Sequence, residues 1–209
     1  MPATRFFIMR HGETVYNAAR RLQANHIHTP LTRLGAEQAL AMGAALRGAL
    51  GDRPAVSLHV SETGRALQTM AMITDVLGLD WFAARRTDDL KEIDMGSWCG
   101  RLYDDVEAEI GPIVLADHLL RPAPDGEDYP MIAARLNRWL GEVADQPGDH
   151  VVVMHGISSR VLRGIMAGYP VHPDLGVPIA PSLMQGSIAL VVEGQETVLF
   201  GSERGTEHA

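Results

Sequence analysis

Two histidines in this sequence follow short apolar runs and come directly before a glycine. His11 follows Arg10 at the end of the run 6–9, and His155 follows the run 151–154. Such short apolar runs are typical of buried strands. Because functional groups gather at the carboxyl ends of the strands of a parallel sheet, we expect Arg10, His11 and His155 to lie close together.

An arginine beside two imidazoles favours chemistry on phosphate over chemistry on a metal ion. Neutral imidazole binds metals or attacks electrophiles, but the fixed charge of Arg10 would repel a divalent cation. The same guanidinium offers a planar fork of donors that matches phosphate oxygens. The residues therefore predict phosphoryl transfer, with one histidine as covalent nucleophile and an arginine that stabilises negative charge.

Six motifs in this order resemble those of the histidine phosphatase superfamily, the phosphoglycerate-mutase-like enzymes. They are RHGET with Asn17, PLTRLGAEQA (30–39), SETGRALQT (61–69), LKEIDMGSWCG (90–100), DGED (125–128) and VVVMHG (151–156). The matches extend from residue 5 to about residue 190. The chain is thus similar to the phosphatase branch of this superfamily over nearly its whole length.

This resemblance implies a role for each matching residue. His11 would attack phosphorus and become a phosphohistidine, and Glu92 would protonate the leaving oxygen and then deprotonate water. The residues that would bind the small phosphorylated substrate are Arg10, Asn17, Gln23, Arg65 and His155. The resemblance implies no cofactor and no metal ion. Among the neighbouring carboxylates, three remain alternatives to Glu92 as the acid: Asp89, Asp94 and Glu127.

Three positions depart from the family pattern. Gln23 is followed by Ala24 where the family usually has glycine, and His28 lies where the family has an aspartate. The family's asparagine near the last strand is Gln185 here. These positions belong to the rim of the expected pocket, so they concern substrate preference more than the reaction.

Alternating strand and helix patterns predict an α/β fold. Apolar residues recur at helical spacing in 31–50, with Thr32 as N-cap, in 62–78, which Gly78 ends, and in 131–144. Short extended pieces are expected in 81–94 and two antiparallel strands in 186–202. We expect a single domain over 1–209, a three-layer αβα structure with a mostly parallel central sheet. The acidic, proline-containing segment at about 100–130 is predicted to form a small cap insertion.

Composition excludes several other classes of protein. A net charge of −8 argues against nucleic-acid binding and against binding to acidic membranes. No apolar run approaches the length of a membrane span or a signal peptide, which predicts a cytoplasmic protein. Lys91, the only lysine, follows Leu90, so there is no phosphate-binding P-loop. Cys99 is the only cysteine, so no disulfide can form within the chain.

Two other functions remain open beside a metal-independent phosphomonoesterase. A phosphoglycerate mutase would need further basic residues after the acid, whereas the segment 104–117 is acidic. The arginines that could still point inward are Arg101, Arg121, Arg135 and Arg138. A non-catalytic module that binds phosphate or phosphoproteins is the third alternative, because the fold does not fix the function. The oligomeric state is also open, with a homodimer as one alternative.

Overall fold

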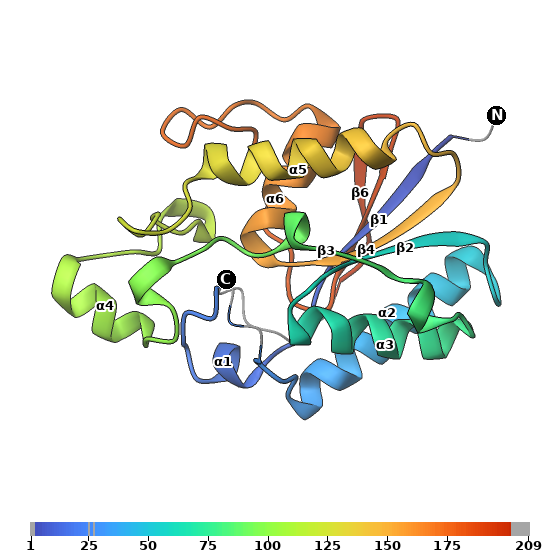
Figure 1. Ribbon diagram of the computed structural model, residues 1–209, viewed down its shortest axis with the longest axis horizontal. Helices are drawn as coiled ribbons and strands as arrows, with labels where there is room; N and C mark the ends of the chain where they lie inside the picture. Colours follow the sequence, from blue (N-terminus) through green and yellow to red (C-terminus); the bar gives the residue numbers. More distant parts are fainter. Residues whose placement is uncertain (1–2, 25, 27, 202–209) are drawn as a thin grey trace.

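The computed structural model describes residues 3–24, 26 and 28–201, and within them six strands form one sheet (Figure 1). The strands lie in the order β3-β2-β4-β1-β5-β6. Their bounds are β1 Arg5–Arg10, β2 Val56–Ser61, β3 Arg85–Thr87, β4 Asp149–Met154, β5 Ile188–Val192 and β6 Gln195–Phe200. Strands β3, β2, β4 and β1 are parallel, while β5 runs antiparallel to both β1 and β6. The mostly parallel sheet and the C-terminal antiparallel pair are confirmed.

Helices cover both faces of this sheet. Their bounds are α1 Val15–Ala18, α2 Arg33–Leu50, α3 Gly64–Leu77, α4 Tyr103–Ile110, α5 Tyr129–Val143 and α6 Gly156–Ala167. Figure 1 shows α2 and α3 on one side of the sheet and α5 and α6 on the other. The α/β class with three layers is therefore confirmed. As a separate finding, none of the helices within the described residues combines the length and the apolar character needed to cross a membrane.

Side-chain alternation along β1 explains why both faces must be covered. Phe7 and Met9 pack into the core beneath α2 and α3, and Phe6 and Ile8 pack into the core beneath α5 and α6. A strand that is apolar on both faces is stable only when helices shield each face from water. The rigid strand that results ends at Arg10, immediately before His11.

Helix α2 begins and helix α3 ends at the capping residues predicted from the sequence. Thr32 caps α2 by accepting a hydrogen bond from the Gly35 amide, and Gly78 ends α3 in the left-handed conformation. Helix α5 begins at Tyr129, two residues before its apolar pattern, because the Asp128 carboxylate accepts from the Met131 amide at 2.8 Å.

The prediction of extended pieces in 81–94 is only partly right. Strand β3 is present, but it is flanked by two 3₁₀ turns, η1 Trp81–Ala83 and η2 Asp88–Leu90. Asp80 and Thr87 cap these turns through their side-chain oxygens. Short polar side chains of this kind compete with the sheet for backbone hydrogen bonds.

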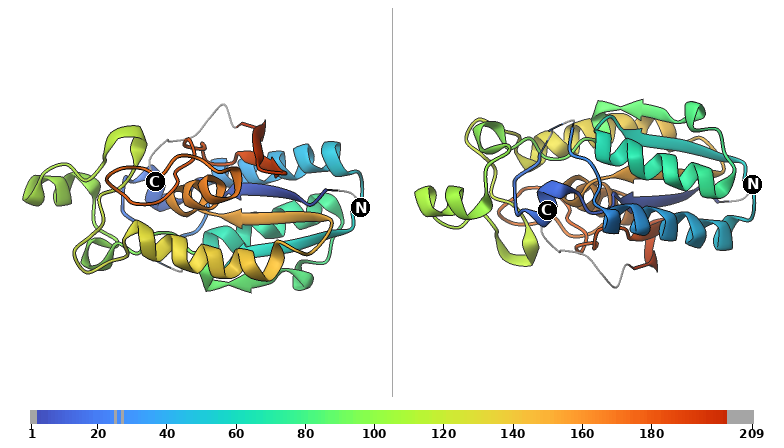
Figure 2. Two further views of the ribbon diagram at one scale, coloured as in Figure 1. Left: turned by 90° about the horizontal axis from the view of Figure 1, so that it is seen from above. Right: turned by 90° about the horizontal axis from the view of Figure 1, so that it is seen from below.

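The segment predicted as a cap projects beyond the carboxyl end of the sheet (Figures 1 and 2). It contains α4, the turn η4 Ala116–His118 and long irregular connections. Buried residues such as Val106, Ile113 and Leu119 join the core beneath α5 and α6. The cap boundaries at about 100–130 and the single domain over 1–209 stay predictions.

Candidate active site

The topology brings the two histidine–glycine turns together. Strands β1 and β4 are adjacent and parallel, and Arg10 lies opposite Met154 in their register. The His11 amide donates to the Met154 carbonyl at 3.1 Å. The imidazole rings of His11 and His155 meet edge to face, with 5.2 Å between their centroids. Parallel pairing therefore places both imidazoles at one edge of the sheet.

Gly12 is required by a close backbone approach behind the histidine. A Cβ atom at this position would lie 2.2 Å from the Gly35 carbonyl oxygen in the first turn of α2. The approach is equally close from the side of α2, since a Cβ on Gly35 would lie 2.0 Å from the carbonyl oxygen of Glu13, the residue after Gly12. The Gly12 amide donates to Thr69 Oγ1 on α3. The glycine pair thus lets α2 pack directly against the turn that carries His11.

Gly12→Ala is expected to lower the free energy of unfolding by about 3 kcal/mol, because the added methyl group forces the backbone of this turn away from α2. Urea unfolding measures the change. Gly48→Ala is the matched control, since Gly48 lies in α2 with nothing within 4 Å of its would-be Cβ. The control should stabilise the protein by up to about 1 kcal/mol. A Gly12→Ala variant as stable as the wild type would contradict the close approach.

Hydrogen bonds fix the tautomer of His11. Its Nδ1 lies 2.7 Å from the Gly12 carbonyl, which can only accept, so Nδ1 carries the proton. Its Nε2 then accepts from Arg65 Nε at 3.2 Å. Burial, followed by the charges of Arg65 and Arg10, holds the pKa of His11 well below its ordinary value. His11 is therefore a neutral imidazole with the lone pair on Nε2.

Arg65 holds the centre of the site. Its Nε also donates to His155 Nδ1 at 3.3 Å, and its terminal nitrogens donate to the Ala24 and His26 carbonyls and to Thr29 Oγ1. Burial lowers the pKa of Arg65 to about 10, so the side chain remains a cation at neutral pH. The segment after α1 is thereby bound directly to the arginine between the two histidines.

The departure at Ala24 has a structural consequence. Ala24 has a φ of +43°, in the left-handed region that glycine adopts most readily. Its carbonyl accepts from Arg65 at 2.5 Å. A glycine at this position would therefore give the same contact with less backbone strain. Gln185 is buried and precedes Gly186, whose amide lies close to the carbonyls of Arg10 and His11.

Arg10 and His155 are fully enclosed. Arg10 donates to the Leu183 carbonyl at 2.9 Å, and burial lowers its pKa while the nearby Glu92 opposes that shift. His155 Nε2 lies 2.7 Å from Ser61 Oγ. Burial, with Arg65 as the next cause, holds the pKa of His155 well below its ordinary value. His155 therefore presents an acceptor, not a donor, to Arg65.

Glu92 is held at the N-terminus of α6. Its Oε1 accepts from the Ile93 and Ser158 amides at 2.9 and 3.0 Å, and its Oε2 accepts from the Ile157 amide at 3.1 Å. The first-turn amides of a helix have no partners within the helix, so they are available to bind this carboxyl group. Because the His155 turn leads directly into α6, one segment positions both His155 and the Glu92 carboxyl group.

These side chains surround a small cavity. Its lining consists of Arg10, His11, Leu22, Gln23, Ala24, Arg65, Glu92, Ile93, Met95, Tyr103 and Leu120. Its volume of about 10 Å³ holds roughly one water molecule. This volume is smaller than that of a phosphoryl group.

Two predicted substrate-binding residues lie outside this lining. His155 reaches the cavity through Arg65, as described above. Asn17 uses its Oδ1 to accept from Thr14 in the capping box of α1, and its buried Nδ2 has no hydrogen-bond partner among the described residues. Gln23 does line the cavity, and its Oε1 accepts from Thr14 Oγ1 at 2.8 Å.

The alternative acids lie elsewhere. Asp89 pairs with Arg138 at the surface, Asp94 accepts from the Gly96 amide, and Glu127 pairs with Arg135. Of the four carboxylates considered from the sequence, only Glu92 lines the cavity. Within the described residues, no three His, Cys, Asp or Glu side chains gather as ligands for a metal ion.

Several site residues were not predicted from the sequence. Tyr103, from the projecting segment, lines the cavity, and burial raises the pKa of its hydroxyl. Ser61 and Thr63 contact His155 Nε2, and Thr69 accepts from the Gly12 amide. The three hydroxyl residues belong to the motif SETGRALQT, which therefore contained a usable signal. Nothing in the local sequence distinguished Tyr103.

A larger cavity of about 520 Å³ lies between α6 and the connection 169–182. It is lined by Arg160, His118 and His172 among others, and by none of the predicted site residues. Volume alone would favour this cavity. The small cavity is nevertheless the candidate active site, because it gathers three buried ionisable groups whose pKa values are lowered by burial.

Comparisons with known proteins match most of the chain. A family model described as the histidine phosphatase superfamily (branch 1) matches residues 6–181. A probable phosphoglycerate mutase GpmB of Yersinia pestis (strain Pestoides F) is 29% identical over 174 residues, which cover 80% of this chain and 77% of that protein.

Solved structures show the same fold. Mycobacterial hydrolase 1 superposes with a TM-score of 0.75 at 25% identity, covering 94% of this chain and 97% of that one. A mycobacterial glucosyl-3-phosphoglycerate phosphatase in complex with VO3 also gives 0.75, at 24% identity, covering 95% and 99% of the two chains.

Proposed function

Because the chain belongs to the histidine phosphatase superfamily, we propose that it hydrolyses a small phosphorylated metabolite through a phosphohistidine on His11, without a metal ion. The observation that carries this proposal is the neutral His11, whose Nε2 accepts from Arg65 and which lines the same cavity as Arg65 and Arg10. A nucleophile that is unprotonated beside two cations suits attack on an anionic phosphoryl group.

In the first half-reaction, the lone pair of His11 Nε2 forms a bond to phosphorus while the bond to the leaving oxygen breaks. Glu92, in its protonated form, gives its proton to that oxygen, so that a neutral alcohol departs. Arg10 and Arg65 stabilise the phosphoryl oxygens with charge-assisted hydrogen bonds. Before this attack, Arg65 exchanges its hydrogen bond to Nε2 for one to the phosphoryl group, which frees the lone pair.

In the second half-reaction, water attacks the phosphohistidine and the nitrogen–phosphorus bond breaks. The Glu92 carboxylate takes the proton from this water, and inorganic phosphate and neutral His11 are formed. The charge of the bound phosphoryl group favours the protonated form of His155, which turns its Nδ1 from an acceptor into a donor. Asn17 Nδ2, buried without a partner among the described residues, is a further donor for the substrate.

Metal independence follows from the charges already present. Phosphoryl transfer requires mainly positioning and stabilisation of charge on the transferred oxygens. Two buried guanidinium groups supply that charge here and would repel a divalent cation from the same space. No metal is therefore needed for the steps above.

A phosphoglycerate mutase is the second candidate, since the relative from Yersinia pestis carries that name as a probable assignment. Three of the four arginines considered for a mutase favour hydrolysis instead, and the fourth, Arg121, is exposed to solvent. Arg101 pairs with Glu109, Arg138 with Asp89, and buried Arg135 with Glu127. Side chains held by the protein's own carboxylates are not available to grip a second anionic group. The cytoplasmic location and the homodimer stay predictions from the sequence.

We expect the wild-type protein to release phosphate from p-nitrophenyl phosphate with excess EDTA present. Because the pKa of His11 is held well below its ordinary value, the nucleophile stays neutral as the pH falls. Activity should therefore persist at about pH 5, where a free imidazole is mostly protonated. Loss of activity with EDTA that returns with added metal would contradict metal independence. Interconversion of 3-phosphoglycerate and 2-phosphoglycerate with no net phosphate release would instead establish the mutase.

A further inference from the structure

The segment that carries Glu92 has no regular secondary structure. Residues 91–95 lie between the turn η2 and the turn η3, Gly96–Trp98, outside every helix and strand. Their backbone groups therefore lack partners in a sheet or helix. An acid that acts on one oxygen must nevertheless hold its position closely, because a misplacement of about 1 Å can cost about 100-fold in rate.

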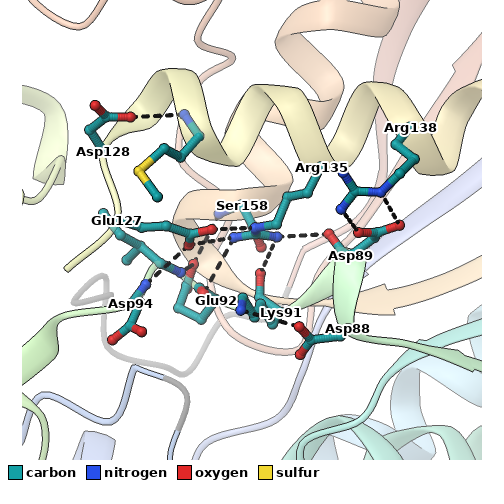
Figure 3. A network of polar contacts seen from close by, with 12 residues as sticks. Asp88, Asp89, Lys91, Glu92, Asp94, Glu127, Asp128, Arg135, Arg138 and Ser158 are labelled. Carbon is teal, nitrogen blue, oxygen red and sulfur yellow. Dashed lines mark hydrogen bonds and ion pairs between the residues drawn. The ribbon is translucent and has the colours of Figure 1, made fainter.

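Arg135 of α5 supplies the missing partners (Figure 3). A guanidinium has five N–H groups, and all five are used. Three of them donate to backbone carbonyls, at 2.7 Å to Asp89, 2.9 Å to Lys91 and 3.3 Å to Glu92 itself. The other two donate to the carboxylate oxygens of Glu127, at 2.8 and 3.0 Å. One side chain therefore ties the backbone on the N-terminal side of Glu92 to α5.

Glu127 fixes the other side of the same segment. Its Oε2 accepts from the Asp94 amide at 3.2 Å, and its own amide donates to the Asp94 carbonyl at 2.9 Å. Gly126 is packed against the same place, since a Cβ there would lie 2.2 Å from the Asp94 carbonyl oxygen. The Arg135–Glu127 pair thus holds the chain at both flanks of Glu92.

The pair is buried, yet it does not line the catalytic cavity. Arg135 and Glu127 are 5% and 8% exposed, and neither is among the residues around the cavity. Removing two charges from water is costly unless their remaining hydrogen-bonding groups are satisfied. Here the geometry that satisfies Arg135 is the same geometry that places the Glu92 backbone.

We propose that Arg135 and Glu127 are positioning residues for Glu92, a role that rests on the proposed function of Glu92 as general acid. The amides of α6 bind the carboxyl group of Glu92, and the Arg135–Glu127 pair binds the backbone of the segment that carries it. Lysine could keep the charge opposite Glu127 but not the planar fork that reaches three carbonyls. Charge and positioning can therefore be separated by one substitution.

Arg135→Lys is expected to reduce kcat/KM for phenyl phosphate about 100-fold and that for p-nitrophenyl phosphate no more than about threefold. Phenolate needs protonation to leave, whereas p-nitrophenolate is a stable anion, so a misplaced acid affects the first substrate more. In a Glu92→Gln background the same substitution should change either value less than about threefold, because the acid is already lost. Circular dichroism establishes that each variant is folded.

Arg138→Lys is the matched control. Arg138 lies one turn along α5 and contacts the Asp89 carboxylate at the surface, away from the backbone of Glu92. Arg138→Lys should leave the ratio of kcat/KM for the two substrates unchanged. If Arg135→Lys does not fold, Glu127→Gln replaces it, since the amide keeps the shape and loses the charge and one acceptor oxygen.

Equal losses on both substrates in a folded Arg135→Lys or Glu127→Gln variant would overturn the positioning role and leave only a structural one. Additive losses in the Glu92→Gln background would overturn it as well. The proposed function fails in a different way. If Glu92→Gln alone reduces kcat/KM equally for both substrates, Glu92 is not the acid, whatever the result at Arg135.

Discussion

His11→Ala is expected to reduce kcat/KM for p-nitrophenyl phosphate by about 10⁴-fold or more, because the variant has no atom that can form the covalent intermediate. The loss should appear even with this activated substrate, since a good leaving group still needs a nucleophile. His11 Nε2 is the unprotonated imidazole nitrogen that accepts from Arg65, and among the described residues that line the cavity no other is a histidine.

Phosphate affinity distinguishes catalysis from binding in this experiment. Arg10 and Arg65 remain in His11→Ala, so calorimetry should show inorganic phosphate bound within about tenfold of the wild-type affinity. His172→Ala is the matched control, a half-buried histidine outside the catalytic cavity, and should retain full activity. Release of phosphate by His11→Ala at the wild-type rate would exclude His11 as nucleophile. A wild-type protein that binds phosphate and releases none would be the binding module.

The parts of the site that strands present were predictable from the sequence. The runs before His11 and His155 are apolar on both faces, which is typical of central parallel strands, and parallel strands end at one edge of the sheet. Adjacent pairing of β1 and β4 then brings the two imidazoles together. Thr32 and Gly78 were equally readable, because a cap depends on a residue and its immediate neighbours.

Contacts between distant irregular segments could not be predicted in this way. Glu92 is held by amides of α6, and Arg65 by carbonyls of the segment after α1. Backbone amides and carbonyls are present at every position, so the sequence carries no signal for which of them a side chain will meet. Arg135 shows the same limit: it was considered for the substrate site of a mutase, but it is buried against Glu127 and does not line the cavity.

Geometry supports Glu92 over its neighbours as the acid, and substitution tests that choice. Glu92→Gln is expected to reduce kcat/KM for phenyl phosphate about 10³-fold, within the range of general acid catalysis. For p-nitrophenyl phosphate we expect a loss of about tenfold, because its leaving group departs without a proton. Asp94→Asn is the matched control, a carboxylate two residues away that does not line the cavity. It should not change the ratio of the two substrates.

The role of Glu92 is identified by the ratio of the kcat/KM losses for the two substrates, not by the size of either loss. In the variant, the glutamine carbonyl can replace Oε1, which accepts from the Ile93 and Ser158 amides. The glutamine NH₂ would then face the Ile157 amide, and two donors repel. This misfit lowers the rate for both substrates alike, whereas loss of the proton lowers it only where the leaving oxygen needs one. Equal losses would therefore leave Glu92 as a structural residue and return Asp89, Asp94 and Glu127 to consideration.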